Sequence, residues 1–174
     1  MGAGNPALEI LLGTIPLLLT LLIHGVGMHG VQRQFEVRGA RIFRSGSHGQ
    51  VFFGAMILVM LATHLVEMLV WAAMVNSIEA IPSFRDAFYY VAGTYTTLGY
   101  AEGMLPHDWR LMGPMIAISG LFAFGWTTGV LVTLVSLAHH ERAQGFADRA
   151  VRAAEAAEAY RRHAAAPPTP PSRT

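Results

Sequence analysis

The chain alternates long apolar runs with shorter polar segments. Apolar residues dominate 8–28, 51–75 and 111–137. Each run is long enough to cross ~30 Å of hydrocarbon at ~1.5 Å per residue. The pattern therefore predicts an all-α membrane protein with three transmembrane helices. No basic residue precedes the first run, and that run is longer than the apolar core of a signal peptide, so we expect a retained helix.

Composition supports a membrane location. Only 13% of the 174 residues are charged, against ~25% in soluble domains, and 53% are hydrophobic. Cysteine is absent, which excludes disulfides and thiolate metal sites. The net charge of +1 gives no support for nucleic-acid binding. Because the chain is so apolar, we expect it to be surrounded by membrane lipids.

The distribution of arginine predicts the orientation. Four arginines lie between the first two runs, and a second basic group follows His139: Arg33, Arg38, Arg41 and Arg44, then Arg142, Arg149, Arg152, Arg161 and Arg162. Basic segments favour the cytoplasmic side. We therefore expect a multi-pass protein of the plasma (inner) membrane, with an external N-terminus, an external segment 77–110 and a cytoplasmic C-terminus.

The C-terminal tail has two parts. Residues 141–166 are rich in Ala, Arg and Glu, which predicts a helix, and the Pro-rich end PPTPPSRT is expected to be disordered. In the helix, residues 146, 150, 153, 157, 160 and 164 follow the spacing of a seam between helices of a bundle. A helix that is solvated on all sides is the alternative.

A polar stretch, GTYTTLGYAEG, interrupts the chain between the second and third runs. Pro82 and Ser83 predict a helix start, with Asp86 in the first turn. The helix expected over 88–95 is too short to span a bilayer, so it would re-enter. Polar backbone at membrane depth is tolerated where it is buried in protein or lines a watery cavity. Inward-facing carbonyls that replace an ion's hydration shell would meet this condition.

These residues resemble the pore family of potassium channels. The resemblance rests on AFYYVAGTYTTLGYAE, then Pro106, then SGLFAFG in the third run, and it covers about 50–140. It implies a homotetramer that conducts K⁺, with no organic cofactor. Its filter carbonyls would belong to Thr97, Leu98, Gly99 and Tyr100, with Ala101 outermost. Filter support would come from Tyr90, Thr96 and Glu102, and a gating hinge from Gly120.

The resemblance also divides the chain into regions. An N-terminal transmembrane helix (1–30) and a basic cytoplasmic loop (31–50) precede a pore domain (51–138), and a cytoplasmic tail (139–174) follows. In the family pattern, Ala101 replaces the second filter glycine and Glu102 an aspartate. An alanine in left-handed geometry costs roughly 1–2 kcal/mol, so the outermost ion site is the one that this change affects.

Several functional alternatives follow from that departure. They are a non-selective monovalent cation channel and a non-conducting membrane sensor with the same fold. An ordinary extracellular loop is the simplest alternative for 93–103. No nucleophile with a positioned base, and no complete metal set, indicates an enzyme.

Ionisable residues raise further hypotheses. His64 and Glu67 are three residues apart and therefore lie on one face of a helix. We expect either a local hydrogen-bonded pair or a pH sensor. His139 and His140 follow the third run at the end of its helix. Their role there would be either a favourable interaction with the helix dipole or the sensing of pH. A haem or metal site would use His24, His29 and His64. Counting along the opposed helices places His24 and Glu67 at different depths, so we expect them not to meet.

Overall fold

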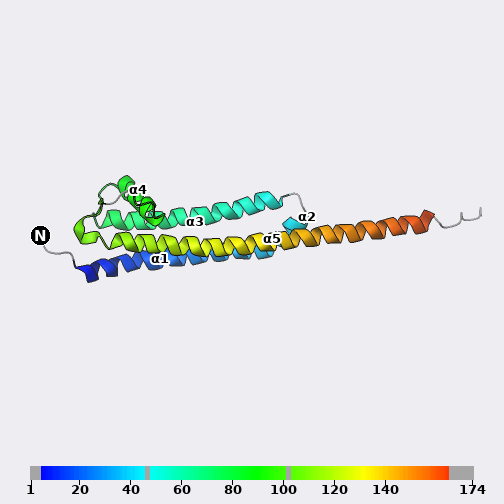
Figure 1. Ribbon diagram of the computed structural model, residues 1–174, viewed down its shortest axis with the longest axis horizontal. Coiled ribbons are helices and arrows are strands. Elements are labelled where there is room, and N and C mark those ends of the chain that lie inside the picture. The colour runs from blue at the N-terminus through cyan, green and yellow to red at the C-terminus, as the bar shows by residue number, and fades with distance from the viewer. Residues whose placement is uncertain (1–4, 46–47, 101–102, 165–174) are drawn as a thin grey trace, which may run out of the picture.

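Three long helices dominate the fold. The computed structural model describes residues 5–45, 48–100 and 103–164, and these residues contain helices and no strand. The long helices are α1 (Pro6–Gln34), α3 (Gly49–Ser77) and α5 (Met112–Ala164). They lie side by side along the longest axis (Figure 1), and each is long and apolar enough to cross a membrane. The all-α prediction with three spans is confirmed.

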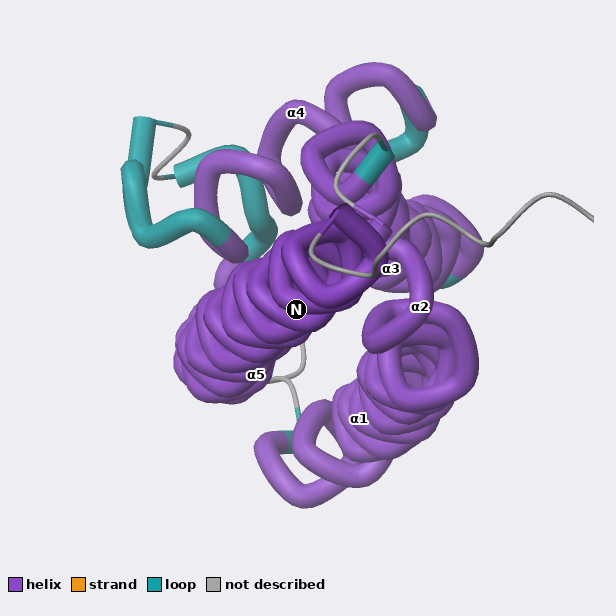
Figure 2. Tube along the Cα trace, turned by 90° about the vertical axis from the view of Figure 1, so that its right-hand side faces the viewer, coloured by secondary structure: helices purple, strands orange, loops and turns teal. Residues whose placement is uncertain are grey.

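Short helices occupy the two ends of this bundle. Helix α4 (Phe84–Tyr95) lies at the end that holds the N-terminus, and a 3₁₀ turn (His107–Trp109) precedes α5. A π-helical turn (Phe35–Gly39) and α2 (Ala40–Ser45) lie at the opposite end. Helix α4 contacts α3 and α5, whereas α1 packs on another side of that pair (Figure 2).

The segment between the first two spans differs from the predicted basic loop. Helix α1 continues past Gly30 to Gln34, and helical structure then extends through Ser45. Phe35 and Phe43 are buried and pack against each other, with ring centroids 5.5 Å apart. This aromatic contact accounts for the helical structure, because it buries apolar surface that a loop would expose.

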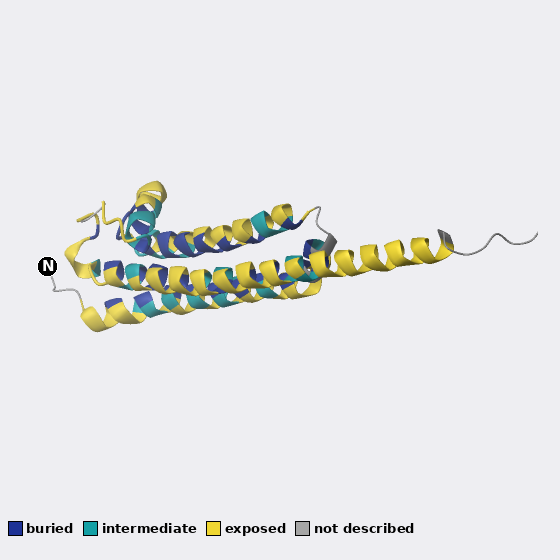
Figure 3. Cartoon of the chain, turned by 45° about the vertical axis from the view of Figure 1, so that its right-hand side comes forward, coloured by how far each residue is buried: buried dark blue, intermediate teal, exposed yellow. Residues whose placement is uncertain are grey.

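Helix α5 is continuous where the sequence predicted a span and a separate tail helix. Gly145 does not interrupt it, because alanine, arginine and glutamate are strong helix formers and one glycine costs only about 1 kcal/mol. Helix α5 is exposed along 146–163, where it extends beyond the bundle (Figure 3). The Pro-rich end, expected to be disordered, lies outside the described residues.

Apolar side chains pack in two clusters along the bundle. The cluster next to α4 includes Trp71, Val75, Val91, Tyr95 and Ile116. The cluster at the other end includes Met28, Phe35, Met60, Val130 and Leu134. Many leucines and valines on the outer faces are exposed instead, among them Leu11, Leu22, Leu58 and Leu121. Such a surface suits lipid or a neighbouring subunit.

Candidate functional site

Helix α4 begins as the sequence predicted. Ser83 is its N-cap, and the backbone N–H of Asp86 donates to Ser83 Oγ at 3.4 Å. The helix has 12 residues, or about 18 Å at ~1.5 Å per residue, which is too short for a bilayer. It packs against two helices that are long enough to span. This is the arrangement expected of a re-entrant helix.

Immediately after α4, the backbone adopts positive φ angles at two residues. Thr97 has φ 61° and Gly99 has φ 71°, whereas Leu98 between them has no positive φ. The N–H groups of Leu98 and Gly99 both donate to the carbonyl of Gly93, at 2.8 and 3.2 Å. Positive φ at a β-branched threonine is an uncommon conformation, which makes this turn a candidate functional site.

These two hydrogen bonds fix the direction of two carbonyls. In a trans peptide the C=O points away from the N–H of the same unit. The carbonyls of Thr97 and Leu98 therefore point away from Gly93 and from α4. The Leu98 and Tyr100 side chains are 60% and 78% exposed in the single chain. The turn thus offers successive carbonyl oxygens to the space beyond α4.

The support residues take different positions. Thr96 caps the end of α4, because its hydroxyl donates to the Ala92 carbonyl at 2.7 Å. Tyr90 is buried, and it lines a pocket together with Thr97 and Gly99. The predicted roles of Ala101 and Glu102 fall outside the described residues.

Gly120 lies where α5 meets the end of α4. A Cβ at this position would come 2.1 Å from the backbone oxygen of Tyr95. Only glycine therefore permits this approach, which holds the last residue of α4 against α5. Helix α5 continues through Gly120, and the hinge stays a prediction. Close packing is a second reason for glycine at this position.

The main correction concerns His24 and Glu67, which were expected not to meet. His24 Nδ1 lies 2.8 Å from Glu67 Oε1, and both side chains are 1% exposed. The prediction was wrong because it assumed that α1 and α3 end at one depth. The two helices are offset along the bundle, so these residues lie at one level.

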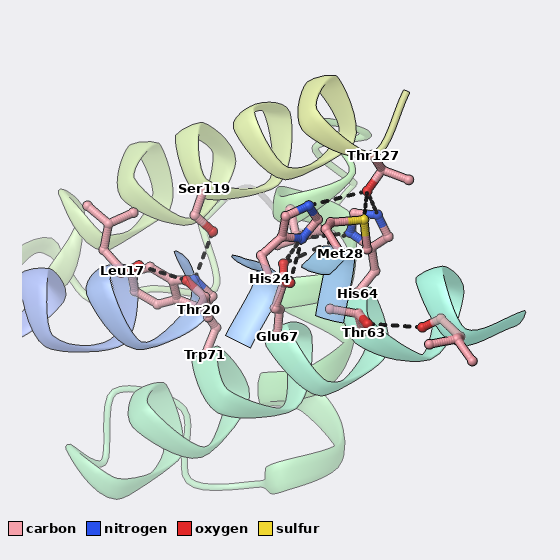
Figure 4. A network of polar contacts seen from close by, with 12 residues as sticks. Leu17, Thr20, His24, Met28, Thr63, His64, Glu67, Trp71, Ser119 and Thr127 are labelled. Atoms are coloured by element: carbon pink, nitrogen blue, oxygen red, sulfur yellow. Dashed lines mark hydrogen bonds and ion pairs between the residues drawn. The ribbon is translucent and has the colours of Figure 1, made fainter. Parts of the chain in front are cut away.

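Three more residues, Tyr95, His64 and Thr127, complete a ring of contacts with this pair, and Figure 4 shows His24, Glu67, His64 and Thr127 together. The Tyr95 hydroxyl donates to Glu67 Oε2 and lies 3.0 Å from His64 Nδ1. His64 Nε2 lies 3.0 Å from Thr127 Oγ1, and that hydroxyl lies 3.3 Å from His24 Nε2. We call these residues the polar ring: His24, Glu67, Tyr95, His64 and Thr127. The ring joins α1, α3, α4 and α5.

The same place is the candidate for a metal ion. Donor atoms of His24, His64 and Glu67 lie within 4.8 Å of one another. His29, which the sequence hypothesis included, is exposed and is not part of this cluster. Every donor atom that would face a metal already has a hydrogen-bond partner in the ring, which favours the metal-free arrangement.

His139 and His140 are not part of the ring. They are exposed on α5 and directly follow Ala138, which belongs to the apolar cluster at the end of the bundle opposite α4. His140 Nε2 lies 2.8 Å from the amide nitrogen of Gln144, one turn further on. His139 and His140 therefore do not contact His64 and Glu67, the other two residues that the sequence analysis proposed for pH sensing.

Sequence reasoning missed Glu9. Its carboxylate is 5% exposed and accepts from the backbone N–H groups of Leu111 and Met112, the latter at 3.1 Å. Glu9 therefore caps the start of α5 from another helix. Its signal was visible, because a carboxylate inside an apolar run is costly unless it has a partner.

Comparison with known proteins identifies the central part of the chain. Residues 56–136 match the family model described as "Ion channel". This segment belongs to the ion-channel family. The ion-channel segment starts in α3, contains α4 and the turn after it, and ends in α5. Since three helices can span, the chain is a multi-pass membrane protein.

No curated protein and no solved structure matches the chain. Helix α1 lies outside the ion-channel segment, yet it contributes His24 to the polar ring and Glu9 to the start of α5. The partners of these two residues belong to α3 and to the start of α5, and both of those helices contact α4. The additional helix therefore helps to position the helices against which α4 packs.

Proposed function

We propose that the chain forms a homotetrameric cation channel that conducts K⁺ passively through a filter of backbone carbonyls. The observation that carries this proposal is the turn after α4. The hydrogen bonds of Leu98 and Gly99 N–H to the Gly93 carbonyl direct the carbonyls of Thr97 and Leu98 away from the helix, and outward carbonyls are what ion coordination requires. The permeant ion would be held by the carbonyls of 97–100, with the Thr97 hydroxyl at the inner end.

A tetramer follows from the geometry of a carbonyl filter. One chain supplies one such turn, whereas a ring of carbonyls in a filter of this kind takes four. Leu98 and Tyr100 are exposed in the single chain, which leaves them free to meet neighbouring subunits. Closed cyclic symmetry would bring the four turns to one axis.

The proposed orientation follows from charge and topology together. Helix α4 and the N-terminus lie at one end of the bundle (Figure 1). At the other end, Arg33 is in the last turn of α1, Arg38 is in the π-helical turn, and Arg142 lies over the Phe43 ring. Because basic segments favour the cytoplasm, the filter would open to the outside. The C-terminal half of α5 would then extend into the cytoplasm.

The test is K⁺ against Na⁺ flux through purified protein in liposomes. We expect Gly99→Ala to abolish K⁺ flux, because residue 99 has φ 71° and a side chain strains that conformation. The matched control is Gly54→Ala, where an added Cβ meets nothing within 4 Å. Its flux should equal that of the wild type.

The two alternative functions are outcomes of the same experiment. Equal Na⁺ and K⁺ flux, abolished by Gly99→Ala, would replace the potassium channel by a non-selective one. Ala101→Gly should then sharpen selectivity, if the alanine reshapes the outermost site. No flux through any folded variant at several pH values would favour the non-conducting sensor.

A further inference from the structure

The polar ring lies apart from the proposed filter and has a composition that the channel function does not explain. Three of its members, His24, His64 and Glu67, have ionisable side chains. Tyr95 is fully buried, and the side chains of these three are at most 5% exposed. Within the described residues, no other titratable side chain hydrogen-bonds to or ion-pairs with the five members.

The number of hydrogens in the ring can be counted. Five contacts join its members, and each needs one hydrogen between its two atoms. Thr127 Oγ1 also lies 3.8 Å from Met28 Sδ, but a thioether is a weak acceptor, so the count assigns the hydroxyl hydrogen to the ring. The hydroxyls of Tyr95 and Thr127 supply one hydrogen each, and two neutral imidazoles supply one each. With Glu67 ionised, which makes it an acceptor only, the ring is one hydrogen short.

One added proton completes the ring. It belongs between His24 Nδ1 and Glu67 Oε1, as an imidazolium–carboxylate pair or as a neutral imidazole with a carboxylic acid. Either way the five groups together carry no net charge, and every contact contains one hydrogen. A second proton, or the loss of the first, would leave a buried net charge and a mismatched contact, both of which are costly.

We infer that the polar ring is a proton-binding site, which holds one proton shared by α1 and α3 in the folded protein. The bound proton stabilises the contact of the additional helix with the ion-channel segment. Through the Tyr95 hydroxyl, it also holds the end of α4 next to the filter turn. This inference goes beyond the proposed conduction and does not depend on it.

The proton count predicts the pH dependence of stability. Stability rises with pH where the unfolded chain binds more protons than the folded one, and falls where it binds fewer. In the unfolded chain at about pH 6.5, Glu67 is ionised and each of the two histidines is half protonated. The three residues then hold one proton in total, the same number as in the folded ring. The contribution of the ring is therefore largest near that pH, and it declines on both the acid and the alkaline side.

The variant Glu67→Gln separates a shared proton from a merely structural contact. The amide nitrogen can donate to His24 Nδ1 while its oxygen accepts from Tyr95, so five hydrogens are present without an ionisable proton. The folded variant then binds no proton in the ring. Its stability should rise with pH through the histidine range and stay level above it, so the alkaline decline of the wild type is lost.

The experiment is the thermal unfolding midpoint of the full-length protein in detergent, across the pH range in which histidine and glutamate titrate. His29→Gln is the matched control, because His29 is an exposed histidine of the same helix, and it should keep the decline on both sides. Loss of the alkaline decline in Glu67→Gln alone supports the inference. An equal drop in midpoint at every pH, with the decline retained, overturns it.

Thr127→Val provides a second variant of nearly unchanged shape. Without the hydroxyl, three contacts remain, and the hydrogens of Tyr95 and two neutral imidazoles satisfy them. We therefore expect the alkaline decline to weaken. An unchanged decline would mean that His24 and Glu67 hold the proton as an isolated pair, and the ring as a site would be rejected.

Discussion

At the scale of single residues, glycines decide how closely the helices approach. A Cβ on Gly27 would come 2.6 Å from Thr63 Oγ1, and one on Gly120 would come 2.1 Å from the Tyr95 backbone oxygen. The first contact sets the spacing of α1 and α3, and the second that of α4 and α5. The sequence analysis gave Gly120 the role of a hinge and gave Gly27 no role, so neither close contact was predicted.

Gly120→Ala tests the packing role. We expect a loss of about 1–3 kcal/mol in the free energy of unfolding, because the methyl group would displace backbone rather than a flexible side chain. Gly125→Ala is the control, since an added Cβ there meets nothing within 4 Å. The measurement is the thermal or denaturant unfolding of both variants. Wild-type stability with altered gating of Gly120→Ala would instead favour the hinge.

At the scale of elements, the starts of α4 and α5 are capped in different ways. Ser83 caps α4 from its own sequence, as predicted, whereas Glu9 of α1 caps α5 across the bundle. A carboxylate at a helix N-terminus satisfies free N–H groups and favours the helix dipole. The start of α5 therefore depends on the additional helix.

Removing this distant cap should loosen the start of α5. We expect Glu9→Ala to reduce the free energy of unfolding by about 1–3 kcal/mol, since the backbone N–H of buried Met112 loses its partner. Glu9→Gln keeps an acceptor oxygen without the charge, and should cost less. Hydrogen exchange of the Leu111 and Met112 amides reports the change directly. Equal exchange in wild type and Glu9→Ala would contradict the capping role.

At the scale of the whole molecule, the single chain leaves two kinds of surface uncovered. Apolar residues cover the outer faces of the bundle, and the end of α5 beyond the bundle exposes Phe146 and Tyr160, at 68% and 76%. These two belong to the predicted seam of the tail. Exposed aromatic residues at seam positions favour contact with other copies over a solvated helix.

The seam can be tested by the oligomeric state. Phe146→Ser together with Tyr160→Ser should lower the fraction of tetramer in detergent, measured by light scattering after size exclusion. The control is Val151→Ser, because Val151 is 57% exposed on the same helix but lies off the seam. If both changes leave the same fraction of tetramer, the tail is a solvated helix.

The sequence by itself determined the spans, the short helix between them and its serine cap. These features depend on local patterns, because apolar length sets a span and residues within one turn set a cap. The same is true of the chain order that gave the resemblance to channels. The glycine at 99, with its positive φ, also follows from local turn chemistry.

Only the tertiary structure decided which ionisable residues meet. Sequence placed His64 beside Glu67, but it separated His24 from both and gave no role to Glu9. Contacts between helices depend on their offset along the bundle, which side-chain packing at positions such as Gly27 and Thr63 fixes. Hydrophobic periodicity carries no information about that offset. The polar ring therefore became visible only when four helices were placed together.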